Sequence, residues 1–327
     1  MVTVAVAGGT GGIGRAIVEA IAEGGKHKII VLARKSDEEL AARLGAPIIA
    51  VDYFNVLELT HTLEKHGVHT VISTINMRTT EGEPPEIELI RAADASKSTK
   101  RMISSEWGIP LGPEEIEKQV QVARKYRAKA AMEEAKDLET TVVYNGYFLD
   151  YYVGPQIKTY LGPATLFVDV EHDAASIPGD GMTPVVYSHT SDVGRLVNAS
   201  LDLKKWEPET YIVCDKVTLN EFVQLAEAAK GTKFKAVYDT VEDLKAGNWT
   251  DLPGQVAALL LVNGAFDLKP ETTLNDMFPK IKTSTVKELL EKAWKNFSGG
   301  PSARATIDQR ILGILLALLY TSLRSVD

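Results

Sequence analysis

The chain has 327 residues, of which 45% are hydrophobic and 24% charged, a composition typical of globular proteins that excludes a disordered chain. Asp and Glu outnumber Lys and Arg by 44 to 36, and the net charge of −8 argues against a nucleic-acid-binding protein, which normally carries a basic patch. The single cysteine, Cys214, excludes an intramolecular disulfide and a thiolate zinc site. Because no positively charged leader precedes the first apolar run, we expect a soluble, cytoplasmic protein without a membrane span.

The first 150 residues alternate short β-branched runs with longer helical patterns, which is typical of a parallel sheet covered by helices. Near-continuous apolar runs, such as residues 2–7 and 28–33, indicate strands that are buried on both faces. The predicted fold class is therefore α/β, with a doubly wound parallel sheet. The expected strands are 2–7, 28–33, 47–51, 70–74, 101–104 and 140–144, and the expected helices are 12–24, 56–66, 85–97 and 113–136.

After residue 150 the alternation weakens, and glycines and prolines become frequent. A strand is expected at 211–214, and helices at 219–229, 251–265 and 284–297. We therefore expect a first domain (1–150), a smaller and irregular α+β region (151–297) laid against the carboxyl ends of the strands, and a tail (298–327).

The tail opens with a linker-like Ser-Gly-Gly-Pro-Ser sequence and contains an almost wholly apolar run at residues 311–320. This run is shorter than the roughly 20 residues that a membrane-spanning helix needs. Three interpretations stay open: a helix docked on this domain or on the second subunit of a homodimer, a non-native tail, and an interfacial membrane anchor.

A glycine-rich turn joins the first strand to the first helix and satisfies the pattern G-x-G-x-x-G. One glycine allows the tight turn, one lets the backbone approach a pyrophosphate, and one lets the helix pack closely on the sheet. The free N–H groups of the helix N-terminus then face the phosphates. The sequence thus predicts a Rossmann-type dinucleotide-binding domain, with the dinucleotide at Gly8, Gly9, Thr10, Gly11, Gly12, Ile13 and Gly14.

The end of the second strand indicates which dinucleotide is bound. NAD-binding proteins place an acidic residue there for the ribose hydroxyls, whereas this chain has Arg34 and Lys35. A guanidinium suits a 2′-phosphate, and the adjacent ammonium adds positive charge. We therefore expect NADPH as the cofactor.

Polar residues follow the next two strands as well. Asp52 and Tyr53 come after the third strand and are expected to flank the adenine, and Thr74 and Asn76 come after the fourth and are expected to line the ribose or the nicotinamide. The reason is positional, because ligands of open α/β sheets bind outside the carboxyl ends of the strands.

Two further segments carry a family resemblance. Residues 101–108 read Arg-Met-Ile-Ser-Ser-Glu-Trp-Gly, and residues 140–148 read Thr-Thr-Val-Val-Tyr-Asn-Gly-Tyr-Phe. In this order after the glycine-rich turn, they resemble the NmrA-like and isoflavone-reductase-like branch of the atypical short-chain dehydrogenases/reductases. The Gly-Asp-Gly turn at 179–181 and the segment 190–195 extend the likeness to about residue 230.

The resemblance implies an NADPH-dependent reductase of a small organic molecule, an aromatic, polyketide or alkaloid-type secondary metabolite, with a lysine as acid/base. The matching position is Lys125, and Lys129, which stands where the family has arginine, remains a rival because the register is uncertain by one or two residues. Partial burial beside a cation would lower a lysine pKa toward neutrality. Only two residues separate Tyr126 from Lys129, one fewer than in the usual Tyr-x-x-x-Lys pair.

The same two segments supply the remaining site residues. We expect Glu106 and Asn145 at the cofactor, and Trp107, Tyr147 and Phe148 at the substrate. The six histidines show no metal-ligand spacing, so no metal site is expected. The resemblance also leaves an alternative, a non-catalytic NmrA-like protein that senses the dinucleotide and regulates a protein partner.

Overall fold

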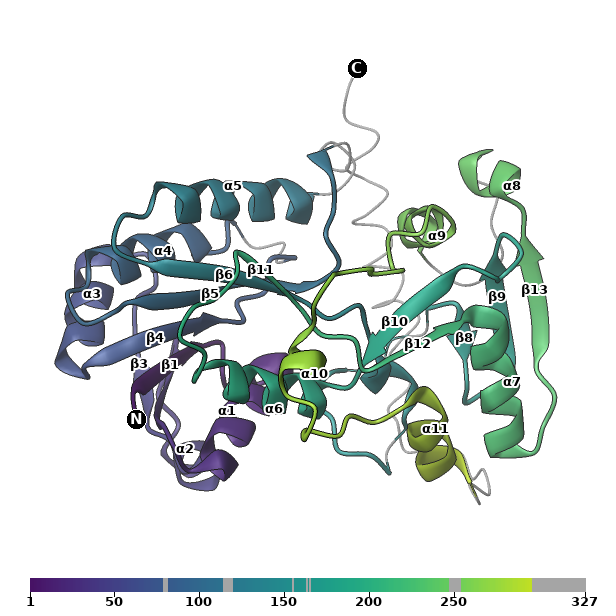
Figure 1. Cartoon of the computed structure of the whole chain (residues 1–327), viewed down its shortest axis with the longest axis horizontal. Coiled ribbons are helices and arrows are strands. Elements are labelled where there is room, and N and C mark those ends of the chain that lie inside the picture. Colours follow the sequence, from purple (N-terminus) through teal and green to yellow (C-terminus); the bar gives the residue numbers. More distant parts are fainter. Residues whose placement is uncertain are drawn as a thin grey trace.

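The protein is described by a computed structural model that covers residues 1–78, 82–113, 120–154, 156–162, 164, 166–246 and 254–295 (Figure 1). Its main sheet has seven parallel strands in the order β11-β6-β5-β4-β1-β2-β3. The doubly wound α/β fold expected from the sequence is thereby confirmed. The strands are β1 (Thr3–Ala7), β2 (Lys28–Ala33), β3 (Ile48–Ala50), β4 (Val68–Ser73), β5 (Arg101–Gly108), β6 (Glu139–Tyr144) and β11 (Glu209–Tyr211).

Helices cover both faces of the main sheet. Figure 1 shows α3, α4 and α5 on one face and α1, α2 and α6 on the other. The strands are apolar on both sides because each side meets a helical layer: Val4 and Val6 of β1 pack in one core, and Ala5 and Ala7 in the other. These helices are α1 (Gly12–Gly24), α2 (Glu38–Leu44), α3 (Val56–Lys65), α4 (Glu86–Ala95), α5 (Val120–Glu134) and α6 (Thr190–Ser200).

Two strands differ from the sequence expectation. β5 continues four residues beyond residue 104, because Gly108 still pairs with Tyr144 of β6 after an irregularity in the ladder. The strand expected at residues 211–214 is wrong. β11 ends at Tyr211, and the backbone N–H of Val213 donates to the side chain of Asn275 (2.9 Å) instead of to a neighbouring strand.

The region after residue 150 is smaller and mixed, as expected. Together with β7, which lies just before residue 150, it forms two three-stranded sheets, in the orders β12-β10-β7 and β13-β9-β8. Their strands are β7 (Tyr147–Phe148), β8 (Val168–Asp169), β9 (Ala174–Pro178), β10 (Pro184–Ser188), β12 (Asp215–Thr218) and β13 (Lys235–Asp239), and the helices are α7 (Leu219–Lys230), α8 (Val241–Ala246), α9 (Gln255–Val262), α10 (Leu274–Met277) and α11 (Val286–Trp294).

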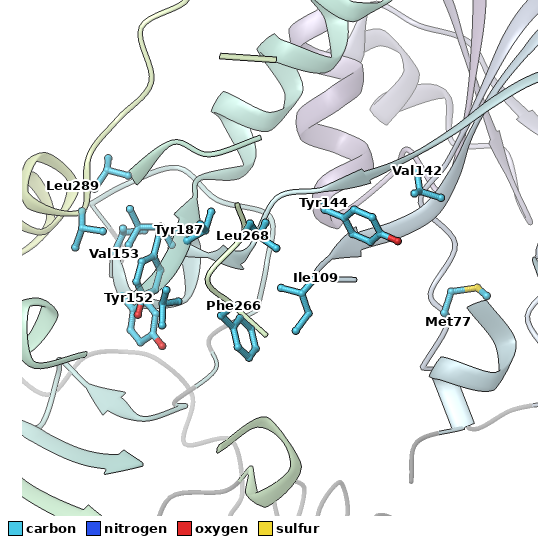
Figure 2. Packing of buried hydrophobic residues seen from close by; sticks show 14 of the residues in the cluster. Met77, Ile109, Val142, Tyr144, Tyr152, Val153, Tyr187, Phe266, Leu268 and Leu289 are labelled. Carbon is cyan, nitrogen blue, oxygen red and sulfur yellow. The ribbon is translucent and has the colours of Figure 1, made fainter. Parts of the chain in front are cut away.

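This region is packed onto the first one in two ways. β11 extends the main sheet beside β6, and α6 lies against α1, where a Cβ on Gly194 would come within 2.7 Å of the Ala16 carbonyl oxygen. Figure 2 shows the second contact, an apolar cluster that runs from Tyr144 at the end of β6 through Phe266 to Tyr152. The C-terminal region therefore stands at the carboxyl ends of the strands.

The tail from residue 298 onward, including the apolar run at 311–320, lies outside the described residues. Among the helices that the structure does describe, none is long and apolar enough to cross a bilayer.

Candidate active site

The glycine-rich turn brings the N-terminus of α1 close to the ends of β1 and β4. Gly8 has a φ of +79°, and a Cβ on Gly14 would lie 2.7 Å from the Gly8 carbonyl oxygen and 2.3 Å from Thr74 Oγ1. A side chain at Gly14 would force the helix away from the strand ends, and one at Gly8 would be strained at this φ and would lie 2.9 Å from the Thr74 carbonyl oxygen. Gly11, by contrast, is in extended backbone with open space beside it.

The first turn of α1 carries no side-chain cap and no acidic residue. Its N–H groups are therefore available to an anion, and the helix dipole favours negative charge there. Ile13 is buried in the apolar core, so it can offer only its backbone to a ligand.

The polar residues expected around the adenine and ribose lie at this edge, but most already have partners. The Tyr53 hydroxyl donates to the Leu32 carbonyl oxygen (2.7 Å), and the Thr74 hydroxyl donates to that of Ala7 (2.7 Å). Both side chains thus fasten strand ends. Asp52 and Asn76 are exposed and accept backbone N–H groups two residues ahead, at 3.0 and 2.9 Å.

Arg34 and Lys35 end β2 as exposed cations. Within the described part of the chain, no carboxylate forms an ion pair with either of them. An unpaired guanidinium beside the glycine-rich turn is placed to meet a phosphate group.

The end of β5 holds a lysine–carboxylate pair. Lys125 Nζ on α5 lies 2.6 Å from the Glu106 carbonyl oxygen and 2.9 Å from Glu106 Oε1. Both side chains are largely buried, with 19% and 13% of their surface exposed. Burial raises the pKa of Glu106, and the neighbouring Lys125 works against that rise.

The rival lysine has a different environment. Lys129 is about half exposed and pairs with Glu209 at 3.3 Å, on the outer strand β11. Tyr126 donates its hydroxyl to the Leu111 carbonyl oxygen at 2.9 Å. Of these three residues of α5, only Lys125 forms a hydrogen bond with Glu106 near the end of β5.

Trp107 lies near the end of β5, and Asn145 follows the end of the neighbouring strand β6. Trp107 has a φ of +28° and donates its indole N–H to the Ser73 carbonyl oxygen (2.9 Å), which ties the β5 loop to β4. Asn145 is fully buried, and its Oδ1 has no hydrogen-bond partner in the structure. An unpartnered buried carbonyl oxygen is costly unless a ligand supplies a donor.

Tyr147 is at the centre of an aromatic cluster. Its ring centroid lies 5.5 to 6.2 Å from those of Tyr151, Tyr152, Tyr187 and Phe266. Burial raises the pKa of its hydroxyl, so the group stays protonated and can donate a hydrogen bond. Phe148 packs against the opposite core.

Sequence reasoning missed Glu86, the first residue of α4. Its fully buried carboxylate accepts bonds from the Ser73 hydroxyl (2.5 Å), the Ser104 hydroxyl (2.7 Å) and the Ser105 backbone N–H (3.0 Å). It therefore joins α4, β4 and β5 directly behind the Glu106 turn. Two serines at the ends of adjacent strands were the only sequence signal.

Arg124, the neighbour of Lys125, was missed too. Its buried guanidinium donates to the carbonyl oxygens of Met77 (3.1 Å) and Gly82 (2.8 Å). α5 thus holds the loop after β4 through Arg124 and the last residues of β5 through Lys125 and Glu106.

These features fit a dinucleotide. The glycine-rich turn leaves backbone room at Gly11, Arg34 forms no ion pair within the described residues, and the buried Asn145 Oδ1 has no hydrogen-bond partner. Among the described residues, no group of three His, Cys, Asp or Glu side chains could hold a metal ion.

The fold and this edge define a Rossmann-type protein of the short-chain dehydrogenase/reductase class. The NmrA-like family model matches residues 2–297, and the chain belongs to that family. The resemblance inferred from the motifs is thereby confirmed.

Relatives and a solved structure agree with this assignment. The chain is 37% identical to Oxidoreductase BOA1 of Botryotinia fuckeliana over 238 residues, which cover 72% of this chain and 79% of that protein. It is 29% identical to Oxidoreductase swnN of Metarhizium robertsii, with 90% and 98% covered. The binary complex of leucoanthocyanidin reductase with NADPH from Vitis vinifera shares the fold, with a TM-score of 0.70, 21% identity, and 89% and 98% covered.

Proposed function

We propose that this protein is an NADPH-dependent reductase that delivers hydride to a small organic substrate and uses Lys125 as the proton donor. The observation that carries the proposal is the buried Lys125–Glu106 pair at the same strand edge as the glycine-rich turn. Relatives named as oxidoreductases, and a structural neighbour solved with NADPH, support both the reaction class and the cofactor.

Each part of the edge has a distinct task in cofactor binding. The N–H groups at the start of α1 bind the pyrophosphate, and Arg34 and Lys35 bind the 2′-phosphate. The Asn145 carbonyl oxygen accepts a hydrogen bond from the cofactor's amide or from the substrate. When bound, NADPH supplies the hydride, and the protein supplies position and charge.

Lys125 supplies the proton. An ammonium has three donors, and Glu106 takes two of them through its carbonyl oxygen and its carboxylate. The third N–H remains for the substrate. A carbon that accepts hydride needs one proton on the neighbouring oxygen or nitrogen, and Lys125 Nζ donates it and becomes a neutral amine. A proton from solvent then restores the ammonium, which pairs again with the Glu106 carboxylate.

The surroundings favour an aromatic or otherwise apolar substrate. Trp107, Tyr147 and Phe148 are each partly exposed near this edge, and burial keeps the Tyr147 hydroxyl protonated. We infer a secondary metabolite of aromatic, polyketide or alkaloid type as the substrate class.

The test compares two lysines one helical turn apart. NADPH consumption is followed with a panel of carbonyl, imine and aryl-ether compounds, and Lys125→Met and Lys129→Met are then measured on any compound that is reduced. We expect Lys125→Met to lower turnover by about 10²–10⁴-fold, the usual contribution of a positioned acid/base, with NADPH affinity nearly unchanged. Lys129→Met, the matched control, should keep turnover within about threefold, because its partner Glu209 is on the surface.

Two results would contradict the proposal. If Lys129→Met is the damaging variant, the acid/base has been assigned to the wrong turn of α5. If NADPH binds but no compound of the panel is reduced, the non-catalytic alternative, a dinucleotide sensor with a protein partner, becomes the better description.

A further inference from the structure

A short segment of the C-terminal region crosses α1 beside the glycine-rich turn. Leu161 of this segment lies against Gly12, the first residue of the helix, because a Cβ on Gly12 would be 3.7 Å from Leu161 Cδ2, an ordinary van der Waals distance. Within the described part of the chain, nothing lies within 4 Å of a Cβ on Gly11. Residues 156–162 (the strap) therefore border the place where the N-terminus of α1 can bind phosphates, and they leave that place open.

Three residues on one face of α1 meet the strap. Gly12, Arg15 and Glu19 are spaced three and four positions apart, so they lie in a row along the helix. Leu161 contacts the first of them, and the ring of Tyr160 stacks on the second, with 4.3 Å between Arg15 Cζ and the ring centroid. The strap thus runs along α1 in the opposite direction, toward the N-terminus of the helix.

The strap is fastened to α1 at the third residue of this row, Glu19. The Tyr160 hydroxyl donates to Glu19 Oε1, and Lys158 Nζ lies 2.7 Å from Glu19 Oε2. These two contacts form the latch. The Lys158 side chain is 68% exposed, and ion pairs open to water contribute little to stability. The latch can therefore open without unfolding the helix.

The start of the strap is held in the interior of the C-terminal region. Ile157 packs in the apolar core. Thr159 stands between the two latch residues, and its hydroxyl donates to Asp150 Oδ1 at 2.6 Å. The buried Asp150 carboxylate also accepts the backbone N–H of Thr190, the first residue of α6, at 2.9 Å. The strap thus combines a buried anchor with a weak outer latch.

We propose that the strap closes over the pyrophosphate of bound NADPH and that its latch at Glu19 sets how fast the dinucleotide leaves. A pyrophosphate at the N-terminus of α1 is enclosed on one side by Leu161, so opening of the latch precedes release. Closing segments of this kind commonly limit the release of ligands from enzymes. The inference rests on the part of the proposed function that puts the dinucleotide at the glycine-rich turn, and it is independent of the role of Lys125.

The test measures the dissociation rate of NADPH from the full chain, by stopped-flow fluorescence with an excess of NADP+ as the competitor. Tyr160→Phe removes the latch hydroxyl and keeps the ring that stacks on Arg15. Glu19→Gln removes the charge that holds Lys158. Glu23→Gln is the matched control, because Glu23 is exposed and lies one turn further along the same helix. Thermal melting shows that each variant is folded.

We expect Tyr160→Phe and Glu19→Gln each to speed NADPH dissociation by about five- to tenfold, the effect of one charge-assisted hydrogen bond at a partly exposed site. The double variant should be little faster than Glu19→Gln, because both changes act on one contact. Glu23→Gln should match the wild type.

Two results would overturn the strap and leave the proposed function standing: dissociation within about twofold of the wild type in both latch variants, or an equal acceleration in Glu23→Gln. A wild type that does not bind NADPH would overturn both proposals.

Discussion

Two glycines of the turn should separate folding stability from cofactor binding. Gly14→Ala places a methyl group 2.3 Å from Thr74 Oγ1 and 2.7 Å from the Gly8 carbonyl oxygen, whereas ordinary contacts begin at about 3.4 Å. The backbone oxygen cannot swing away, so α1 must move out by roughly 0.7 Å, an overpacking that costs about 1–3 kcal/mol. The higher helix propensity of alanine offsets up to about 1 kcal/mol of this loss in the free energy of unfolding.

Gly11→Ala is the matched opposite. Gly11 has a φ of −155°, which alanine adopts freely, and nothing lies within 4 Å of the added methyl. The free energy of unfolding should therefore change by less than about 0.5 kcal/mol. If the pyrophosphate sits over this position, the same methyl should weaken NADPH binding by at least about tenfold, or ~1.4 kcal/mol.

Urea unfolding and a fluorescence titration with NADPH measure the two quantities separately. The reasoning is refuted for the site if Gly11→Ala binds NADPH like the wild type, because the dinucleotide then does not cross the N-terminus of α1. It is refuted for the packing if Gly14→Ala is more stable than the wild type.

Arg34→Ala should reduce the preference for NADPH over NADH by at least about tenfold, because one phosphate–guanidinium contact supplies ~1.4 kcal/mol; calorimetric titration with both nucleotides measures it, and equal affinities in the wild type would contradict it. Burial raises the pKa of Glu86, so the folded state holds its proton more tightly than the unfolded chain. This contribution to stability is complete below the pKa of 4.5 of an ordinary glutamate and is lost as the pH rises through the raised pKa. The urea midpoint should therefore fall with rising pH more steeply in the wild type than in Glu86→Gln, which cannot ionise, and parallel profiles would show that Glu86 does not titrate. Glu86→Ala should lower the free energy of unfolding by about 3–5 kcal/mol, because three donors lose their buried acceptor. A free energy of unfolding from two-state urea curves within about 1 kcal/mol of the wild type would argue against Glu86 as the acceptor that joins α4, β4 and β5.

Local sequence predicted most of the regular elements in the first 150 residues and the glycine-rich turn. The strand expected at residues 28–33 has the same bounds as β2. A strand that is buried on both faces is a nearly continuous apolar run, so its ends are easy to recognise in the sequence. The glycine-rich turn was recognisable because it needs glycine at fixed spacing between a strand and a helix, and all of that lies within about a dozen residues.

Tertiary structure decided what depends on residues far apart in the chain. Our proposal of Lys125 rather than Lys129 as the proton donor rests on the contact of Lys125 with Glu106, nineteen positions earlier, and a helical pattern cannot supply that contact. Glu86 was hidden because its partners Ser104 and Ser105 lie across a strand crossover. β11 joins β6 from more than sixty residues away. Local residue spacing determines backbone geometry. A contact such as that of Lys125 on α5 with Glu106 on β5 forms only when the tertiary structure places the helix beside the strand.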